Sequence, residues 1–321
     1  MRVKVLSLAG DTVRFIIEGV DVAFANALRR TMISEVPSMT VDDLFIFDNS
    51  SVVPDEALAH RIGLVPLKTD LDSYVLPGEC ECGSDLGCSL CRVVLTLDVR
   101  ADDGNRTVTS GDFVSEDPKA VPASPDIPLA KLVPGQAIRL EAYARLGTGR
   151  AHAKWQPVSM AVYQHVAEIE VDEERCTACA ECAEACPVGL ISLEGGKFNV
   201  VDINACTLCG ECAKACPVDP IALTQGTKAD AFLFTVESTG GLQPERIVSE
   251  AAKVLIAKLD ELRGKIDRGE TDEEITDFEI VEQAAQKLYT VGAGDQAEEE
   301  EAVKEEKKDD EPRVEEDDPE P

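Results

Sequence analysis

The sequence predicts an α+β protein in which a cysteine-rich segment interrupts a framework of strands and amphipathic helices. Three observations predict this class. Apolar and polar residues alternate in short stretches, apolar residues recur at helical spacing near residues 22–33 and 247–266, and eight of the twelve cysteines lie between residues 176 and 216. With 321 residues the chain is long enough for two or three domains.

The N-terminal segment is predicted to form two strands and a helix. Residues 1–18 contain two alternating apolar stretches that are separated by a turn at Gly10. Asp21 can cap a helix that runs to about Ser34, and Pro37 ends it. The apolar stripe of this helix consists of Val22, Ala25, Leu28, Met32 and Ile33.

The middle of the chain favours strands over helices. A short helix is expected at 54–61, and Gly and Pro clusters at 118–135 predict a long loop. The candidate strands are residues 40–47, 92–100, 137–146 and 159–163.

A further strand at 230–238 precedes the longest amphipathic helix, at 243–266. A single helix of this length cannot hide its whole apolar stripe against a small local core, so we expect internal packing to use part of it and a partner chain to use the rest. Residues 274–289 could form a weaker helix. Residues 267–321 as a whole are expected to be an acidic, largely disordered C-terminal extension. The stripe of the long helix consists of Ile247, Ala251, Val254, Leu255, Leu259, Leu262 and Ile266.

Residues 176–217 contain the pattern Cys-x2-Cys-x2-Cys-x3-Cys-Pro twice. Three closely spaced thiolates can hold one face of an iron–sulfur cube, while the cysteine before proline ligates the other cube. This pattern predicts a ferredoxin-like module at 168–225 with two [4Fe-4S] clusters, in which metal bonds replace the missing burial of a small core. The first cluster is assigned to Cys176, Cys179, Cys182 and Cys216, and the second to Cys206, Cys209, Cys212 and Cys186.

Zinc or disulfide bonds are the alternatives for these eight cysteines. Both fit the doubled order of the motif less well than ferredoxin-type ligation does. Cluster ligation also needs reduced thiolates, which is consistent with a reducing cytoplasm.

A second cysteine group has the spacing Cys-x-Cys-x5-Cys-x2-Cys in a Gly-rich loop. Four thiolates this close can bind one tetrahedral zinc ion, and a site without an open position would be structural. A metal-free loop with four solvent-facing thiols is the alternative. The group comprises Cys80, Cys82, Cys88 and Cys91.

Net charge and the absence of known motifs limit the possible functions. The formal net charge is −31, of which residues 292–321 contribute −11, so the acidity extends over the rest of the chain. Such a surface repels phosphate backbones, and we expect no principal contact with DNA or RNA. The sequence has no targeting pattern and no apolar run near about eighteen residues, which predicts a soluble cytoplasmic protein without a membrane contact. Phosphate-binding loops, dinucleotide fingerprints and nucleophile elbows are absent, so we expect no catalytic residues.

Several segments outside the ferredoxin-like module together resemble the alpha-like assembly subunit (type D) of archaeal DNA-directed RNA polymerases. That family is similar to the bacterial alpha subunit and to the third-largest subunit of eukaryotic RNA polymerase II. The resemblance covers about residues 1–266 and includes the closing strand and long helix at 230–266. The motifs are Phe24-Ala-Asn-Ala-Leu-Arg-Arg30, Ile33-Ser-Glu-Val-Pro37, Phe47-Asp-Asn-Ser-Ser51, His60-Arg-Ile-Gly-Leu-Val-Pro-Leu67 and His152-Ala-Lys-Trp-Gln-Pro-Val158.

The resemblance implies a discontinuous alpha-like dimerisation domain built from about 1–40 and 226–266. A β-rich insertion domain at 41–167 and the ferredoxin-like domain at 168–225 would interrupt it. It further implies a heterodimer with the small subunit L, on which the large catalytic subunits assemble. The cysteine loop of the eukaryotic relative binds zinc but has a three-residue central gap, whereas here the gap is five residues.

Two functions of different kinds follow from the sequence. The first is a non-catalytic assembly subunit of RNA polymerase, whose clusters are structural and could also tune assembly to oxygen or iron supply. The second is a ferredoxin-type electron carrier that feeds a separate catalytic partner. A metal-dependent enzyme is a weaker third alternative, because cysteine fills every predicted cluster ligand position. For the first function, the predicted interface residues are Val22, Ala25, Leu28, Met32, Ile247, Val254, Leu255 and Leu262.

Overall fold

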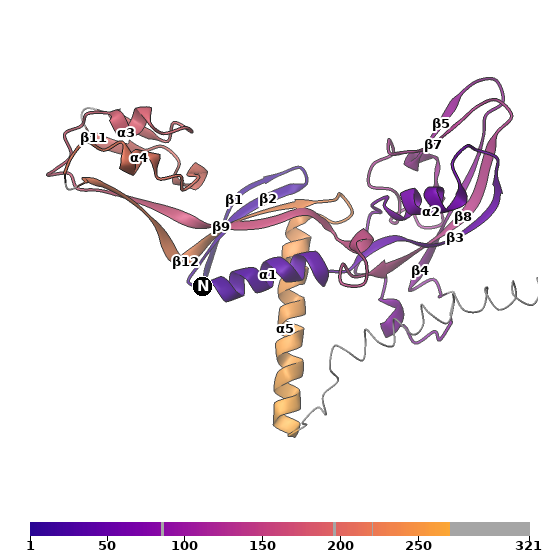
Figure 1. Ribbon diagram of the computed structural model, residues 1–321. Helices are drawn as coiled ribbons and strands as arrows, with labels where there is room; N and C mark the ends of the chain where they lie inside the picture. The colour runs from indigo at the N-terminus through magenta and orange to yellow at the C-terminus, as the bar shows by residue number, and fades with distance from the viewer. Residues whose placement is uncertain (85–86, 195–196, 220, 270–321) are drawn as a thin grey trace, which may run out of the picture. The chain divides into compact units, whose positions relative to one another are not determined.

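The computed structural model describes residues 1–84, 87–194, 197–219 and 221–269 (Figure 1). Two compact units are distinguished, residues 1–259 and residues 260–321. Of the second unit, the described part is the end of the last helix. The weaker helix expected at 274–289 and nearly all of the acidic extension lie outside the described residues.

The first sheet is antiparallel and joins both ends of the first unit, with strand order β1-β2-β12-β9. The two N-terminal strands pair through a two-residue turn at Gly10 and Asp11, where Gly10 has a φ of 55° that favours glycine. The strands are β1 (Arg2–Ala9), β2 (Thr12–Glu18), β9 (Val158–Val171) and β12 (Leu223–Ser238).

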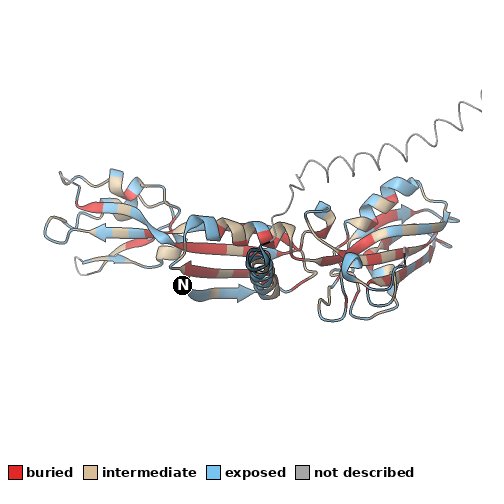
Figure 2. Cartoon of the chain, turned by 90° about the horizontal axis from the view of Figure 1, so that it is seen from below, coloured by how far each residue is buried: buried red, intermediate tan, exposed pale blue. Residues whose placement is uncertain are grey.

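Two helices contribute to the core on one face of this sheet. Helix α1 (Val22–Ser34) begins where the Asp21 side chain accepts a hydrogen bond from the Phe24 N–H at 2.8 Å, as the sequence predicts. Helix α5 (Pro244–Arg268) buries only its first turns, and most of its surface is exposed (Figure 2). At the centre of this core, the rings of Phe15 and Phe234 stack with centroids 5.1 Å apart.

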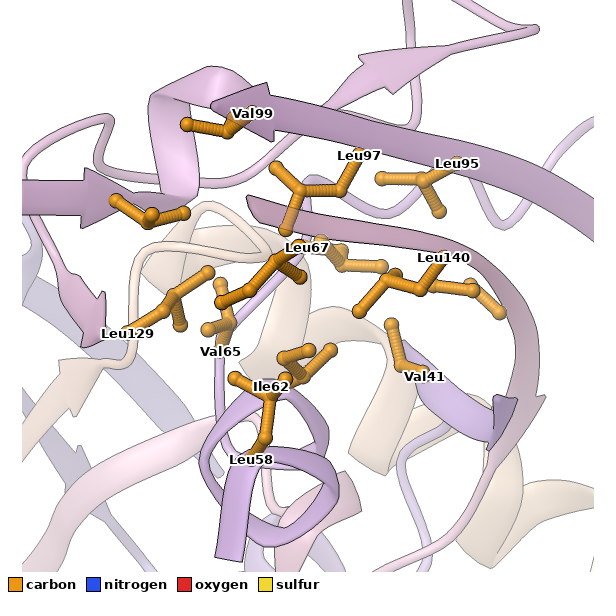
Figure 3. Packing of buried hydrophobic residues seen from close by; sticks show 14 of the residues in the cluster. Val41, Leu58, Ile62, Val65, Leu67, Leu95, Leu97, Val99, Leu129 and Leu140 are labelled. Atoms are coloured by element: carbon orange, nitrogen blue, oxygen red, sulfur yellow. The ribbon is translucent and has the colours of Figure 1, made fainter. Parts of the chain in front are cut away.

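The second sheet has the order β3-β8-β4-β6 and is also antiparallel. Its inner face packs on helix α2 (Asp55–Gly63), where Leu58 and Ile62 are fully buried against leucines such as Leu95 and Leu140 (Figure 3). A separate two-stranded ribbon is formed by segments that lie between β4 and β8 in the sequence. The strands of the sheet are β3 (Ser38–Asn49), β4 (Arg92–Arg100), β6 (Val114–Ser115) and β8 (Ala137–Gly147), and those of the ribbon are β5 (Arg106–Thr109) and β7 (Pro128–Leu132).

The segment between β9 and β12, residues 172–222, is called here the cysteine lobe. Its two ends are neighbours, because Val171 pairs with Leu223. The described residues of the lobe include two short helices and two paired strands, which are α3 (Glu181–Glu184), β10 (Ile191–Glu194), β11 (Lys197–Val200) and α4 (Glu211–Lys214). Short 3-10 helices also lie at Pro77–Glu79, Ser110–Asp112, Ala153–Trp155 and Ile203–Ala205.

The expected α+β class is confirmed, and the structure adds that the sheets are antiparallel. Two local expectations were wrong. The segment 118–135 is not one loop, since it contains β7, which pairs with the preceding strand β5. The strands expected at 159–163 and 230–238 are longer, because β9 and β12 continue to pair up to the cysteine lobe. The β12 side of this continuation, residues 224–230, is largely polar and exposed, so it carries no strand pattern in the sequence.

Candidate functional site

The four cysteines of the first group lie together at the tip of the loop that precedes β4. Their Sγ atoms all lie within 4.8 Å of one another, with Cys80 to Cys88 at 3.7 Å and Cys82 to Cys91 at 3.9 Å. A tetrahedral zinc with Zn–S bonds of about 2.3 Å places its sulfurs roughly 3.8 Å apart. The donor set therefore fits a closed zinc site, despite the five-residue central gap.

Backbone contacts support this loop around the thiols. The Cys88 N–H donates to the Cys91 Sγ at 3.2 Å. The backbone N–H of Leu90 lowers the pKa of the Cys88 thiol to about 7. Gly87 has a φ of 77°, and a Cβ there would lie 3.1 Å from the Cys91 Sγ, so glycine suits this position twice over. The loop is thus shaped to keep four sulfurs at metal-binding distance.

The eight cysteines of the cysteine lobe line two separate hollows. Each hollow contains three cysteines from one copy of the motif and the pre-proline cysteine from the other copy. Apolar side chains such as Leu193 and Phe198 in one hollow, and Leu190 and Ile191 in the other, complete the walls. The first hollow is lined by Cys176, Cys179, Cys182 and Cys216, and the second by Cys186, Cys206, Cys209 and Cys212.

This arrangement differs from that of the zinc loop. Within the part of the chain that the structure describes, the sulfurs of neither set gather to the distances found at Cys80–Cys91. A cube that binds each thiolate at a different iron needs its ligands spread around a hollow, whereas a single ion needs them close together. The donor chemistry and the spread of the thiols fit two iron–sulfur cubes.

The two pre-proline cysteines accept hydrogen bonds from backbone N–H groups that follow them. The Leu190 N–H donates to the Cys186 Sγ at 3.4 Å. Burial alone would raise the pKa of Cys186, but the backbone N–H groups that follow it outweigh burial and lower that pKa. At Cys216 the Val218 N–H is the main cause of a lowered pKa. Such N–H groups favour thiolates, the form in which cysteine ligates metal.

A third candidate site is an apolar groove of about 300 Å³ on the first sheet. It lies between β1, β2, α1 and the start of α5. Its walls include side chains that are unusually exposed for their type: Val3 is 54% exposed, Val5 is 62% exposed and Phe24 is 37% exposed. The described residues of the groove are Met1, Val3, Val5, Val13, Phe15, Ile17, Phe24, Leu28, Glu245, Val248, Ser249 and Ala252.

The structure divides the predicted interface residues into three groups. Val22 and Leu262 are more than half exposed, and Val254 and Leu255 are half-buried. The other four lie in the core of the first sheet, with Leu28 also reaching the floor of the groove. These four core residues are Ala25, Leu28, Met32 and Ile247.

Sequence reasoning missed most of the groove. Val3 and Val5 are identified only as strand residues by their alternation, and Val248 lies beside the stripe of the last helix. The first strand contained a usable signal for the groove. Its apolar residues Val3, Val5 and Leu8 belong to a short N-terminal hairpin that has no further segment to bury them, and exposed apolar residues of this kind indicate a binding surface. None of the helices that the structure describes is long and apolar enough to span a bilayer.

Comparison with known proteins identifies the framework that carries these sites. Residues 14–259 match the family described as the RNA polymerase Rpb3/Rpb11 dimerisation domain. The chain is 43% identical to the DNA-directed RNA polymerase subunit Rpo3 of Archaeoglobus fulgidus over 260 residues, which cover 81% of this chain and 96% of that protein. It is 39% identical to the DNA-directed RNA polymerase subunit Rpo3 of Methanosarcina mazei, over 84% of this chain and 99% of that protein. It is 35% identical to the DNA-directed RNA polymerase II subunit rpb3 of Dictyostelium discoideum, over 83% of this chain and 95% of that protein. The chain therefore belongs to the Rpb3/Rpb11 dimerisation-domain family of RNA polymerase subunits.

Proposed function

We propose that this chain is a non-catalytic assembly subunit of DNA-dependent RNA polymerase, which pairs with a small subunit of the L or Rpb11 type to form the platform for the large catalytic subunits. The observation that carries the proposal is the exposed apolar groove on the domain that matches the dimerisation family. The names of the relatives in three organisms are consistent with this role.

The groove has the properties of an unpaired interface. Met1, Val3 and Val5 expose apolar area to water in the lone chain. Burying this area against a partner would stabilise the complex by about 25 cal/mol per Å². Interfaces of obligate partners bury more than about 2,000 Å², which exceeds what the groove alone can supply. The remainder must come from neighbouring surface.

Helix α5 supplies a continuation of the groove. Val248 and Ala252 line the groove, and the apolar positions Leu255, Leu259 and Leu262 follow at alternating spacings of three and four residues. Leu259 is 65% exposed and Leu262 is 54% exposed. This spacing is that of a coiled-coil seam, so we infer that a helix of the small subunit lies along α5.

We further propose that the cysteine lobe holds two [4Fe-4S] clusters and that the Cys80–Cys91 loop holds one structural zinc ion. In the lobe each cluster would join both copies of the motif, which stabilises a segment too small for a large apolar core. Clusters bound there would also supply one-electron redox chemistry, through which oxygen or iron supply could regulate assembly. An electron-carrier function accounts for residues 168–225 alone and leaves the groove without a role. We infer a cytoplasmic location and no principal nucleic-acid contact, as the acidic surface favours.

Coexpression with the small subunit tests the pairing. The double variant Val3→Asp/Val5→Asp should lose binding by roughly a hundredfold or more, because two carboxylates would be buried without partners. Val201→Asp is the matched control, since Val201 is 69% exposed and lies outside the groove. A wild-type chain that stays a stable monomer and never captures the small subunit would refute the pairing.

Metal analysis after strictly anaerobic purification tests the cofactors. We expect about eight irons, about eight sulfides and about one zinc per chain. The variants Cys182→Ser and Cys212→Ser should each lower the iron content. If these variants assemble equally well under reducing and oxidising conditions, the regulatory part of the proposal is wrong and the structural part remains.

A further inference from the structure

The second half of helix α5 presents an apolar row that is exposed in the described structure. Leu259 is 65% exposed, Leu262 is 54% exposed and Ile266 is 68% exposed, and these residues recur at spacings of three and four. Together with Ile256, which is 58% exposed, they are called here the distal seam. Large apolar side chains that share one side of a helix indicate a surface that another segment covers.

Helix α5 ends in a conformation that suits a reversal of the chain. Gly269 has a φ of 65°, and its N–H donates to the Ile266 carbonyl at 3.0 Å. A left-handed glycine directly after a helix is a common C-terminal cap. The sequence continues as Glu270-Thr271-Asp272-Glu273-Glu274, which contains the Thr-x-x-Glu pattern of a helix N-terminus. A connection of two residues between a cap and a new helix is long enough for the two helices to lie antiparallel.

The sequence after this turn carries an apolar row that matches the distal seam in reverse. Residues 271–289, called here the cover segment, include the weaker helix expected at 274–289 and lie outside the described residues. Apolar positions before and after residue 270 fall at nearly equal distances from it, so an antiparallel pair of helices brings them opposite each other. The matching positions are Ile266 with Ile275, Leu262 with Phe278, Leu259 with Val281, and Ile256 with Ala285.

Charge complements the apolar rows near the turn. Residues 262–268 of α5 carry three basic side chains and one acidic side chain, a net charge of +2 in a chain of net charge −31. Residues 271–277, which would lie opposite them, carry four carboxylates and no basic side chain. Basic groups also stabilise a helix C-terminus and acidic groups a helix N-terminus. The basic residues are Arg263, Lys265 and Arg268, and the carboxylates are Asp272, Glu273, Glu274 and Asp277.

We propose that the cover segment folds back on helix α5 and occupies the distal seam of the free chain, until the helix of the small subunit displaces it. This inference rests on the proposed function, since that function places the partner's helix along the same side of α5. A helix over residues 271–289 is roughly 28 Å long, so the cover reaches back to about Ala252, which lines the apolar groove. The groove then stays open to the small subunit while the distal seam is closed.

A second copy of the chain is the competing occupant of the distal seam. Two chains of net charge −31 repel each other. A segment that is joined to the seam by a short turn has a high effective concentration there and loses no translational freedom on binding. The cover segment of the same chain is therefore favoured over a helix from another molecule.

Photo-crosslinking in the isolated full-length chain tests the cover without any partner. Benzoylphenylalanine in place of Leu262 should crosslink within the chain to residues 271–289, which mass spectrometry identifies. Glu261 is the control position, because it is also exposed but lies about 200° around the helix from Leu259. A crosslink from position 262 to a second copy, a crosslink to no residue of the cover segment, or an equal crosslink from position 261 would overturn the inference.

Substitutions in the cover segment test the displacement. If about nine chains in ten are covered, Phe278→Asp/Leu288→Asp should raise the affinity of the full-length chain for the small subunit by roughly tenfold. Thr276→Asp/Gln283→Asp adds the same charge outside the apolar row and should leave the affinity unchanged. Biolayer interferometry compares the two variants with the wild type. An unchanged affinity for the first variant, or an equal increase for both, would refute the displacement.

The two experiments separate the cover from the pairing function. The crosslink forms in the absence of the small subunit, so a missing crosslink refutes the cover and leaves the pairing intact. If the wild type and both variants all fail to bind the small subunit, the pairing function and the displacement are wrong, whereas the crosslink still decides whether the cover exists.

Discussion

The two copies of the cysteine motif differ at one position where backbone conformation predicts opposite mutational effects. Ala180 has φ 69° and ψ −3°, and Gly210, thirty residues later, has φ 76° and ψ 0°. Both residues precede a short helix, and both are left-handed. A left-handed conformation costs an L residue about 1–2 kcal/mol but costs glycine nothing. The first copy therefore carries strain that the second copy avoids.

The magnitudes can be worked out for both substitutions. Glycine gives the unfolded chain about 0.4–1 kcal/mol more conformational freedom than alanine, which offsets part of the relief. Ala180→Gly should then stabilise the lobe by about 0.5–1 kcal/mol, and Gly210→Ala should destabilise it by a similar amount. Steric clash should not contribute to the effect of Gly210→Ala. A Cβ at residue 210 would meet only the Gln225 side chain, at an ordinary contact distance of 3.5 Å.

Anaerobic thermal unfolding, followed by far-UV circular dichroism and by the visible absorbance expected of the proposed clusters, measures both effects. For a domain of this size 1 kcal/mol corresponds to about 4–8 °C in Tm, so the two variants should lie on opposite sides of the wild type. If both substitutions shift Tm in the same direction, left-handed strain does not decide the stability of these loops.

Three other predictions concern the framework. Gly149→Ala would place a Cβ against the Ile33 carbonyl oxygen of α1 and should destabilise the chain by about 1–3 kcal/mol. Gly104→Ala is the control, because a Cβ at residue 104 meets open space and should change the stability little. Chemical denaturation compares the unfolding free energies of the two variants. Ile247→Ala leaves a cavity at a fully buried position and should cost about 2–5 kcal/mol in the same assay. The Lys119 ammonium, 2.7 Å from Asp70, is the main cause of a pKa of Asp70 well below its usual range. Because the pKa of Asp70 is lowered in the folded chain, its ion pair stabilises the fold above about pH 4, and this stabilisation is lost as the pH falls further. Lys119→Met should therefore flatten the acid limb of a plot of unfolding free energy against pH. An unchanged acid limb would refute this cause.

Elements with local signals could be predicted from the sequence. The helix after Asp21 was found because the cap and the apolar stripe both act within one or two turns. The short helix at Asp55–Gly63 and the long helix at Pro244–Arg268 were found within two residues at each end for the same reason. The ribbon formed by β9 and β12 was found only in part, since its pairing joins residues far apart in sequence and the polar, exposed residues 224–230 of β12 have no apolar alternation.

The candidate sites show the same division. Spacing alone predicted which cysteine accompanies which triplet in the lobe, and the two hollows contain those sets, although whether clusters fill them stays a prediction. The groove could not be assembled from spacing, because it combines β1 with residues of α5 that are distant in sequence. Which side of a helix meets its own sheet depends on long-range contacts: Ile247 is fully buried, whereas the neighbouring Val248 lines the groove.

The position of the cysteine lobe constrains how the proposed clusters would influence assembly. The lobe is inserted between β9 and β12, whose ends Val171 and Leu223 pair directly, so the insertion begins and ends at neighbouring positions of the sheet. The proposed ligands join one half of the lobe to the other, and none comes from the sheet. An effect of the clusters on the groove can therefore pass along the β9–β12 ribbon, or through the hydrogen bond that the Arg14 guanidinium of β2 donates to the Asn204 carbonyl of the lobe at 3.5 Å. That ribbon has a shift in register between Thr227 and Phe232, which interrupts the ladder between the lobe and the core residue Phe234. If cluster loss changes partner binding, hydrogen exchange should accelerate in β12 on both sides of this shift. Exchange that changes only on the lobe side would show that the interruption isolates the groove from the metals.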